Sequence, residues 1–101
     1  MGCNGMPYIK VRWHHSFPNE PVILYSEMDE NRKEVRKVEV YADGSCGYAG
    51  NGQELGGASL GLVAIPPLEE IAANPQFEPL EMSKEEFEKI WEHRMEHLRN
   101  S

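Results

Sequence analysis

The stretch that decides the fold covers residues 36–49 and reads Arg-Lys-Val-Glu-Val-Tyr-Ala-Asp-Gly-Ser-Cys-Gly-Tyr-Ala. Apolar and polar residues alternate on both sides of Asp43-Gly44, as they do in half-buried strands. Asp-Gly tolerates the positive φ angles of a two-residue type I′ turn, so this stretch predicts a β-hairpin in which Val40 lies opposite Gly47. One face of that hairpin leaves room for another element, since it carries Val38, Val40, Gly47 and Ala49.

The segments before the hairpin predict more strands. Residues 8–14 alternate cleanly, and the apolar side of this strand carries Ile9, Val11 and Trp13. Residues 22–28 are apolar on both sides, which is typical of an internal strand. A third strand begins near Lys33 and runs into the hairpin.

The segments after the hairpin predict a short strand, a short helix and an extended crossover. The strand covers residues 60–65 and stops at Pro66-Pro67. Pro67 suits the first turn of a helix, and residues 68–73 supply about two turns. Residues 75–82 then form the crossover.

Residues 83–98 predict an amphipathic helix. Ser83 and Glu86 have the spacing of a capping box. The apolar stripe of this helix has helical spacing and comprises Phe87, Ile90, Trp91, the stem of Arg94, Met95 and Leu98. We therefore expect an α+β fold: an antiparallel sheet of about five strands, with the C-terminal amphipathic helix and the short helix packed on one face. Residues 7–101 form a single domain and residues 1–6 a flexible tail.

The charge of the chain is unevenly distributed. Its 101 residues carry a net charge of −7, and residues 43–101 hold the whole excess of Asp and Glu. Such an excess repels nucleic acid and favours a basic partner, although solubility alone also explains it. No apolar run approaches the ~20 residues that span a bilayer, and residues 1–7 contain no secretory apolar region. We therefore expect no membrane association, a cytoplasmic location and reduced thiols at Cys3 and Cys46.

Two motifs suggest a ligand site, and each has a plainer interpretation. His93 and His97 match the H-x-x-E-H pattern of zinc peptidases, but almost no chain follows to supply a third ligand, so a solvated helix end is the alternative. The glycine-rich residues 50–59 have the spacing of a phosphate loop, but Ala58 replaces the phosphate-binding lysine. We expect neither a metal nor another cofactor.

The outward face of the first strand is a candidate interaction surface. It carries Tyr8, Lys10, Arg12 and His14, to which the third strand adds Lys37 and Tyr41. Aromatic and cationic residues that alternate on a sheet are typical of platforms for single-stranded nucleic acid. The acidic charge argues against that function, and cross-strand pairing with Glu27 and Glu39 explains the same residues structurally.

Nearly the whole chain resembles a family of small bacterial domains of unknown function. The matching residues include Tyr8-Ile-Lys-Val-Arg-Trp13, Glu20-Pro-Val22, Tyr25-Ser-Glu27, Val35-Arg-Lys-Val-Glu39, Asp43-Gly44, Gly47-Tyr-Ala49, Leu60-Gly61, Pro66-Pro-Leu-Glu-Glu-Ile71, Phe87 and Trp91. The resemblance implies no activity and no catalytic residue. In size and acidity such domains resemble the cytosolic immunity proteins that neutralise bacterial toxins.

These observations predict a non-enzymatic protein-binding module that engages a basic partner. The acidic second half contributes Glu54, Glu69 and Glu70 to its interaction surface. The alternative is a regulator that binds a small ligand or nucleic acid on the sheet face around Tyr8, Arg12 and Tyr41. A homodimer is also compatible with the sequence, because an open strand edge can pair with another copy.

Overall fold

A computed structural model describes residues 8–50, 52–55, 58, 60–61 and 64–99, and for Gln53, Leu55 and 93–99 it describes the backbone only. The flexible tail expected over residues 1–6 lies outside this part of the chain. In the described residues no helix is both long and apolar enough to span a membrane.

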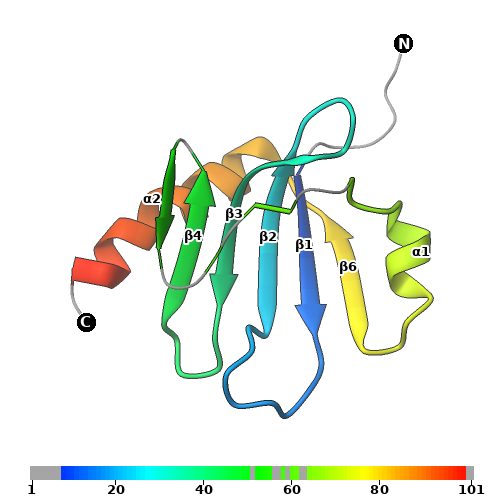
Figure 1. Cartoon of the computed structure of the whole chain (residues 1–101), viewed down its shortest axis with the longest axis horizontal. Helices are drawn as coiled ribbons and strands as arrows, with labels where there is room; N and C mark the ends of the chain where they lie inside the picture. Colours follow the sequence, from blue (N-terminus) through cyan, green and yellow to red (C-terminus); the bar gives the residue numbers. More distant parts are fainter. Residues whose placement is uncertain (1–7, 51, 56–57, 59, 62–63, 100–101) are drawn as a thin grey trace.

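The fold is α+β, as expected, and is built on one antiparallel sheet (Figure 1). Within the described part of the chain the sheet has six strands, one more than the sequence predicted, in the order β5-β4-β3-β2-β1-β6. Their bounds are β1 Tyr8–Trp13, β2 Ile23–Met28, β3 Glu34–Val40, β4 Cys46–Gly50, β5 Gln53–Leu55 and β6 Phe77–Glu81. The short helix α1 (Leu68–Ala72) lies beside β6, and the long helix α2 (Lys84–Arg99) crosses the sheet.

The central hairpin exists, but its turn is one residue longer than expected. The Gly44 N–H donates to the Tyr41 carbonyl (2.9 Å), and the Tyr41 N–H donates to the Ser45 carbonyl (2.9 Å). Gly44 has a φ of 88°, which a residue without a side chain adopts readily. The loop is therefore the three-residue type in which a turn is followed by a left-handed glycine. The prediction of a two-residue type I′ turn was wrong.

This extra residue shifts the register of the hairpin by one. Val40 pairs with Cys46 instead of Gly47, and Val38 pairs with Tyr48. A shift of one residue moves every side chain of a strand to the opposite face. The face that carries Val38 is therefore completed by Tyr48, and Gly47 and Ala49 lie on the other face.

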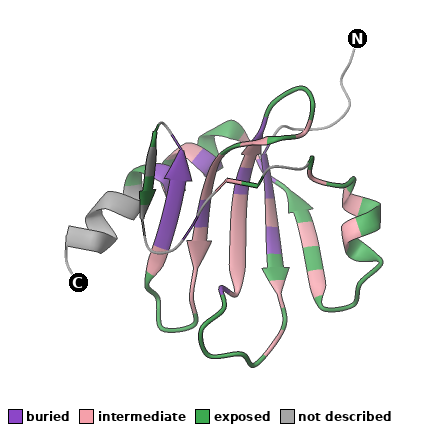
Figure 2. Ribbon diagram, in the orientation of Figure 1, coloured by how far each residue is buried: buried purple, intermediate pink, exposed green. Residues whose placement is uncertain are grey.

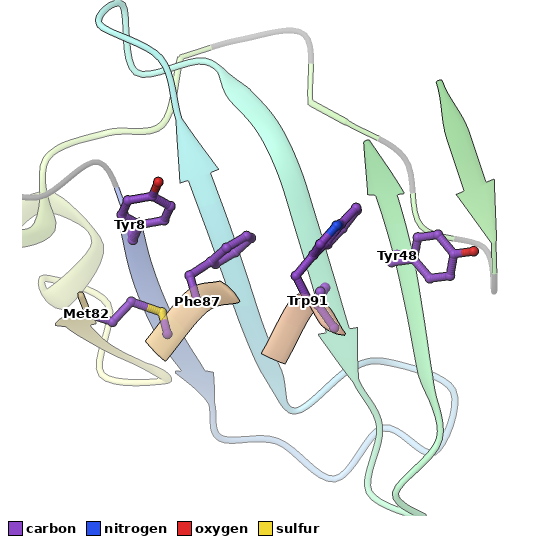
Figure 3. Packing of buried hydrophobic residues seen from close by; sticks show 6 residues of the cluster. Tyr8, Tyr48, Met82, Phe87 and Trp91 are labelled. Atoms are coloured by element: carbon purple, nitrogen blue, oxygen red, sulfur yellow. The ribbon is translucent and has the colours of Figure 1, made fainter. Parts of the chain in front are cut away.

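Helix α2 packs on the Val38 face. Its capping box is formed as predicted: the Ser83 N–H donates to Glu86 Oε1 (2.9 Å), and the Glu86 N–H donates to Ser83 Oγ (3.1 Å). Phe87 and Trp91 project from α2 toward the sheet, as Figure 3 shows. The expectation that Gly47 and Ala49 lie on the hairpin face that receives another element was wrong, because the register places those residues on the opposite face.

Aromatic rings fill the layer beneath α2. The Phe87 ring lies 5.2 Å from that of Tyr8 (centroid to centroid), and the Trp91 ring lies 5.6 Å from that of Tyr48. Phe87 is fully buried. Figure 2 shows that buried residues lie on β1, β2, β3, β4 and the first half of α2, whereas β6 and α1 carry none.

The opposite face of the sheet is covered less completely. A second apolar cluster there contains Ile9, Val11 and Met28, with partly buried Leu24, Ile65, Leu68, Ile71 and Phe77 around them. Helix α1 and the segment before it supply the cover.

The strand expected over residues 60–65 is not formed in the four of these residues that the structure describes, Leu60, Gly61, Ala64 and Ile65. Arg32 holds this segment from the side instead. Its carbonyl accepts from the Ile65 N–H (2.7 Å), and its guanidinium donates to the carbonyls of Ile65 and Pro66 (2.8 Å each). The segment consequently lies over the sheet and does not extend it. The additional strands are β5, within the glycine-rich region, and β6, within the expected crossover.

Candidate functional site

The structure does not assemble the interaction face that the sequence predicted. Tyr8 was expected on the surface, but it is only 7% exposed and lies beneath α2. Its hydroxyl donates to Glu27 Oε2 (3.1 Å), and burial raises the pKa of Tyr8. The expectation failed because α2 covers the end of the sheet where β1 begins.

The other predicted residues are divided between the two faces. Lys10 lies in line with Tyr25 and Val38, and its Nζ stands 5.9 Å from the centre of the Tyr25 ring. Lys37 and Tyr41 belong to the opposite face, which is set by alternation along β3. No continuous row of aromatic and cationic residues results, and this removes the main structural argument for a nucleic-acid platform.

His14 and Arg12 remain accessible near the open end of β1. The His14 Nε2 lies 2.9 Å from Oε1 of Glu78 on the neighbouring strand β6. Arg12 is exposed and pairs in register with the same glutamate residue. The cations of this region therefore lie beside an acidic strand.

A polar network that the sequence did not predict fastens α2 to the sheet. Arg36 on β3 forms ion pairs with Glu27 on β2 and Glu88 on α2. Its guanidinium also lies 5.0 Å from the centre of the Phe87 ring and 5.1 Å from that of Trp91. A planar guanidinium suits simultaneous pairing and stacking. The spacing of Phe87, Glu88 and Trp91 indicates that these residues lie near one another on one helix. It does not indicate which strand supplies the arginine that contacts them.

Exposed carboxylates gather on α1 and β6. Residues 38–83 contain seven Asp and Glu and no Lys or Arg, which accounts for the whole net charge. Four of these carboxylates are exposed on the two elements, and we call them the acidic edge: Glu69, Glu70, Glu78 and Glu81. Glu54 is also exposed, but it lies on β5 at the other edge of the sheet. The predicted Glu69 and Glu70 therefore share one surface, and Glu54 does not.

The outer backbone of β6 offers few donors to another strand. Alternation along the ladder with β1 turns the backbone groups of Phe77, Pro79 and Glu81 outward. The Phe77 N–H already donates to Asn74 (3.0 Å), and Pro79 has no N–H. Proline on an edge strand is a common protection against pairing with a second chain. A homodimer built through this edge is consequently disfavoured.

A cleft of about 320 Å³ lies between α1 and the sheet, next to the acidic edge. Its walls are mainly apolar and come from Ile9, Val11, Leu24, Ile65, Pro66, Ile71 and Phe77. Its polar lining consists of Ser26, Glu34, Lys37, Glu70 and Asn74. Pockets of this size and composition commonly receive ligands or anchor side chains.

Two charged groups of the cleft, Glu34 and Lys37, form a cluster with the neighbouring Glu39. The Lys37 ammonium lies 3.4 Å from Glu34 Oε1 and 3.4 Å from Glu39 Oε2. Glu34 also accepts from the Ser26 hydroxyl (3.2 Å) and from the Gly61 N–H (2.6 Å). Two carboxylates therefore share one ammonium, and the cluster keeps one negative charge.

No metal centre is formed by the side chains that the structure describes, since no three of their His, Cys, Asp or Glu groups converge. The side chains of His93 and His97 lie outside this part, so the H-x-x-E-H hypothesis is not tested. The glycine-rich residues 50–59 are described only in part, and β5 begins within them.

Residues 7–96 match a family model described as a domain of unknown function (DUF6881). No curated protein matches the chain, and no solved structure matches it.

Proposed function

The chain belongs to the DUF6881 family, and from that premise we propose a function for its surface: a non-enzymatic binding module whose acidic edge engages a basic protein partner. The observation that carries this proposal is the concentration of exposed carboxylates on α1 and β6, two elements without any Lys or Arg. A run of exposed carboxylates along neighbouring elements favours a partner that presents a cationic surface.

The neighbouring groups support the same choice of surface. Among the side chains that the structure describes, the acidic edge has one ion-pair partner, His14, which pairs with Glu78, and both side chains of that pair are more than half exposed. Exposed pairs contribute little to stability. The carboxylates are therefore available to a partner without loss of folding energy.

We propose further that the module works in a bacterial cytoplasm in the manner of an immunity protein. Its small size, its acidity and its two-cysteine composition support this, since a basic toxin domain is a partner of complementary charge. This extension is an analogy of size and charge.

The experiment compares two variants with the same change in net charge. Glu69→Gln, Glu70→Gln and Glu81→Gln are combined in the first, and Glu20→Gln, Glu30→Gln and Glu54→Gln in the second. All six residues are exposed, but only the first three belong to the acidic edge. Both proteins and the wild type are used to capture partners from the source cell, and a captured partner is then purified.

We expect the purified partner to be basic and to bind the wild type more weakly as salt rises, mainly through a slower association rate. The acidic-edge variant should lose at least about tenfold in affinity, while the control variant loses much less. An affinity that does not change with ionic strength, or an equal loss of affinity in both variants, would contradict the proposal.

A further inference from the structure

We propose that the cleft between α1 and the sheet receives one apolar side chain, aromatic or branched aliphatic, from the basic segment that binds the acidic edge. This inference rests on the proposed function and names the second feature that its partner must have. The cleft would then determine specificity on a surface that otherwise distinguishes partners by their charge alone.

The shape of the cleft fits one large side chain. Its volume of about 320 Å³ is at the lower end of the range for small-molecule sites, which begins near ~300 Å³. Ile9 and Val11 from β1, Leu24 from β2, Ile71 from α1 and Phe77 from β6 all contribute to its walls. These residues stand on four different elements, so the cleft is defined by the tertiary fold. An apolar side chain buried at the centre of an interface contributes more to affinity than the charged rim around it.

The charge around the cleft selects the flanking residues of that segment. Of the described residues in the lining, only Lys37 is cationic, and it already lies between Glu34 and Glu39. Glu70 stands in the lining itself, and Glu81 pairs in register with Ile9 on the same face. An apolar side chain flanked by Lys or Arg therefore complements both the walls and the surroundings.

A second copy of the chain fits this surface poorly. Each copy has a net charge of −7 and would bring its own carboxylates to the same place. The cleft is therefore assigned to a partner of opposite charge.

The test uses three acetylated and amidated pentapeptides: Lys-Lys-Phe-Lys-Lys, Lys-Lys-Ala-Lys-Lys and Glu-Glu-Phe-Glu-Glu. Each is titrated to millimolar concentration into the labelled full chain, and binding is followed by the methyl resonances of Ile9, Val11, Leu24 and Ile71. We expect the first peptide to shift these resonances and to bind at least about tenfold more tightly than either of the others.

The outcomes separate this inference from the proposed function. If Lys-Lys-Phe-Lys-Lys and Lys-Lys-Ala-Lys-Lys bind equally, the cleft does not receive the apolar side chain. The proposal that the acidic edge binds a basic partner would then still stand. If Lys-Lys-Phe-Lys-Lys and Glu-Glu-Phe-Glu-Glu bind equally, the charge argument is overturned, and with it both this inference and the proposed function. No shift with the first peptide, or shifts that follow protein concentration without peptide, would also overturn the inference.

A narrowed cleft provides the second measurement. Leu24→Phe adds bulk to a partly exposed wall residue, and its folding is checked by the backbone amide spectrum. We expect this variant to bind Lys-Lys-Phe-Lys-Lys at least about fivefold more weakly than the wild type does, and to bind Lys-Lys-Ala-Lys-Lys with unchanged affinity. An equal change for both peptides would contradict the pocket.

Discussion

Arg36 on β3 grips the carboxylate of Glu88 on α2 with both terminal nitrogens: Nη2 lies 2.6 Å from Oε2, and Nη1 lies 3.2 Å from Oε1. The two residues are far apart in the sequence, so this contact fastens the last helix to the middle of the sheet. The Arg36 side chain is 12% exposed and the Glu88 side chain 34%, so the pair is partly shielded from solvent and interacts more strongly than fully exposed pairs.

Replacing Arg36 should destabilise the protein. In Arg36→Ala, Glu27 and Glu88 lose their partner and two rings lose a stacked cation, so we expect a loss of about 3 kcal/mol in the free energy of unfolding. Arg36→Lys keeps the charge but loses the guanidinium that pairs through two nitrogens. Its stability should therefore lie between those of Arg36→Ala and the wild type. Urea unfolding measures the loss. Arg12→Ala, an exposed arginine on β1, is the control and should change stability by less than about 0.5 kcal/mol.

The same ion pair should make the stability of the protein depend on pH in the acidic range. The hydrogen bonds from Arg36 lower the pKa of Glu88 below its ordinary value of 4.5. A carboxyl group whose pKa is lowered by folding stabilises the protein above its unfolded pKa, and this contribution disappears as the pH falls through the folded pKa.

Glu88→Gln should therefore be less stable than the wild type at neutral pH, and the difference should shrink as the pH falls through 4.5 and below. Unfolding measured for both proteins across this range gives the difference directly. A difference that stays constant with pH would show that the charge of Glu88 is not involved.

Gly50 makes room for the arginine. A Cβ on Gly50 would lie 2.7 Å from Cγ of Arg36, and the φ of Gly50 is 142°. Gly50→Ala should thus combine backbone strain with a steric clash and reduce stability by about 2–4 kcal/mol. Gly52→Ala is the matched control, because Gly52 has a φ of 80° and, chain neighbours aside, no described heavy atom lies within 4 Å of the added methyl group. It should show the backbone strain alone, about 1 kcal/mol. Equal losses in thermal unfolding would rule out the clash.

The first turn of α2 depends on its capping box. Ser83→Ala removes the hydroxyl that accepts from the Glu86 N–H, and we expect a loss of about 1 kcal/mol. Ser83→Thr keeps the hydroxyl and should stay within a few tenths of a kcal/mol of the wild type. Denaturant unfolding of the three proteins measures the effect, and equal stability of the alanine and threonine variants would contradict it.

The hairpin illustrates how far sequence patterns reach. Alternation around Asp43-Gly44 correctly predicted two paired strands, because a half-buried surface imposes a period of two. The turn length was wrong, since Asp-Gly serves both the two-residue turn and the three-residue turn with a left-handed glycine. One residue of difference moved the side chains of β4 to the opposite faces, so Tyr48, and not Gly47 and Ala49, lies on the face that α2 covers.

The candidate site was predictable only in part. Glu69 and Glu70 were correctly expected to be exposed acidic residues, since a charge excess in the second half of the chain can be counted directly. The fate of Tyr8 could not be predicted, because its burial depends on where α2 crosses the sheet. The cleft was invisible for the same reason: its walls come from segments that meet only in the folded chain.

The sequence by itself determined the local elements: the alternating strands, the capped C-terminal helix and the placement of every Lys and Arg outside residues 38–83. Each of these follows from neighbours in the chain, through backbone geometry, capping and composition. Only the tertiary structure decided the register of β4, the burial of Tyr8, the grip of Arg36 on Glu88 and the cleft beside the acidic edge. Those features depend on contacts between distant segments, which form only when the whole sheet and both helices pack together.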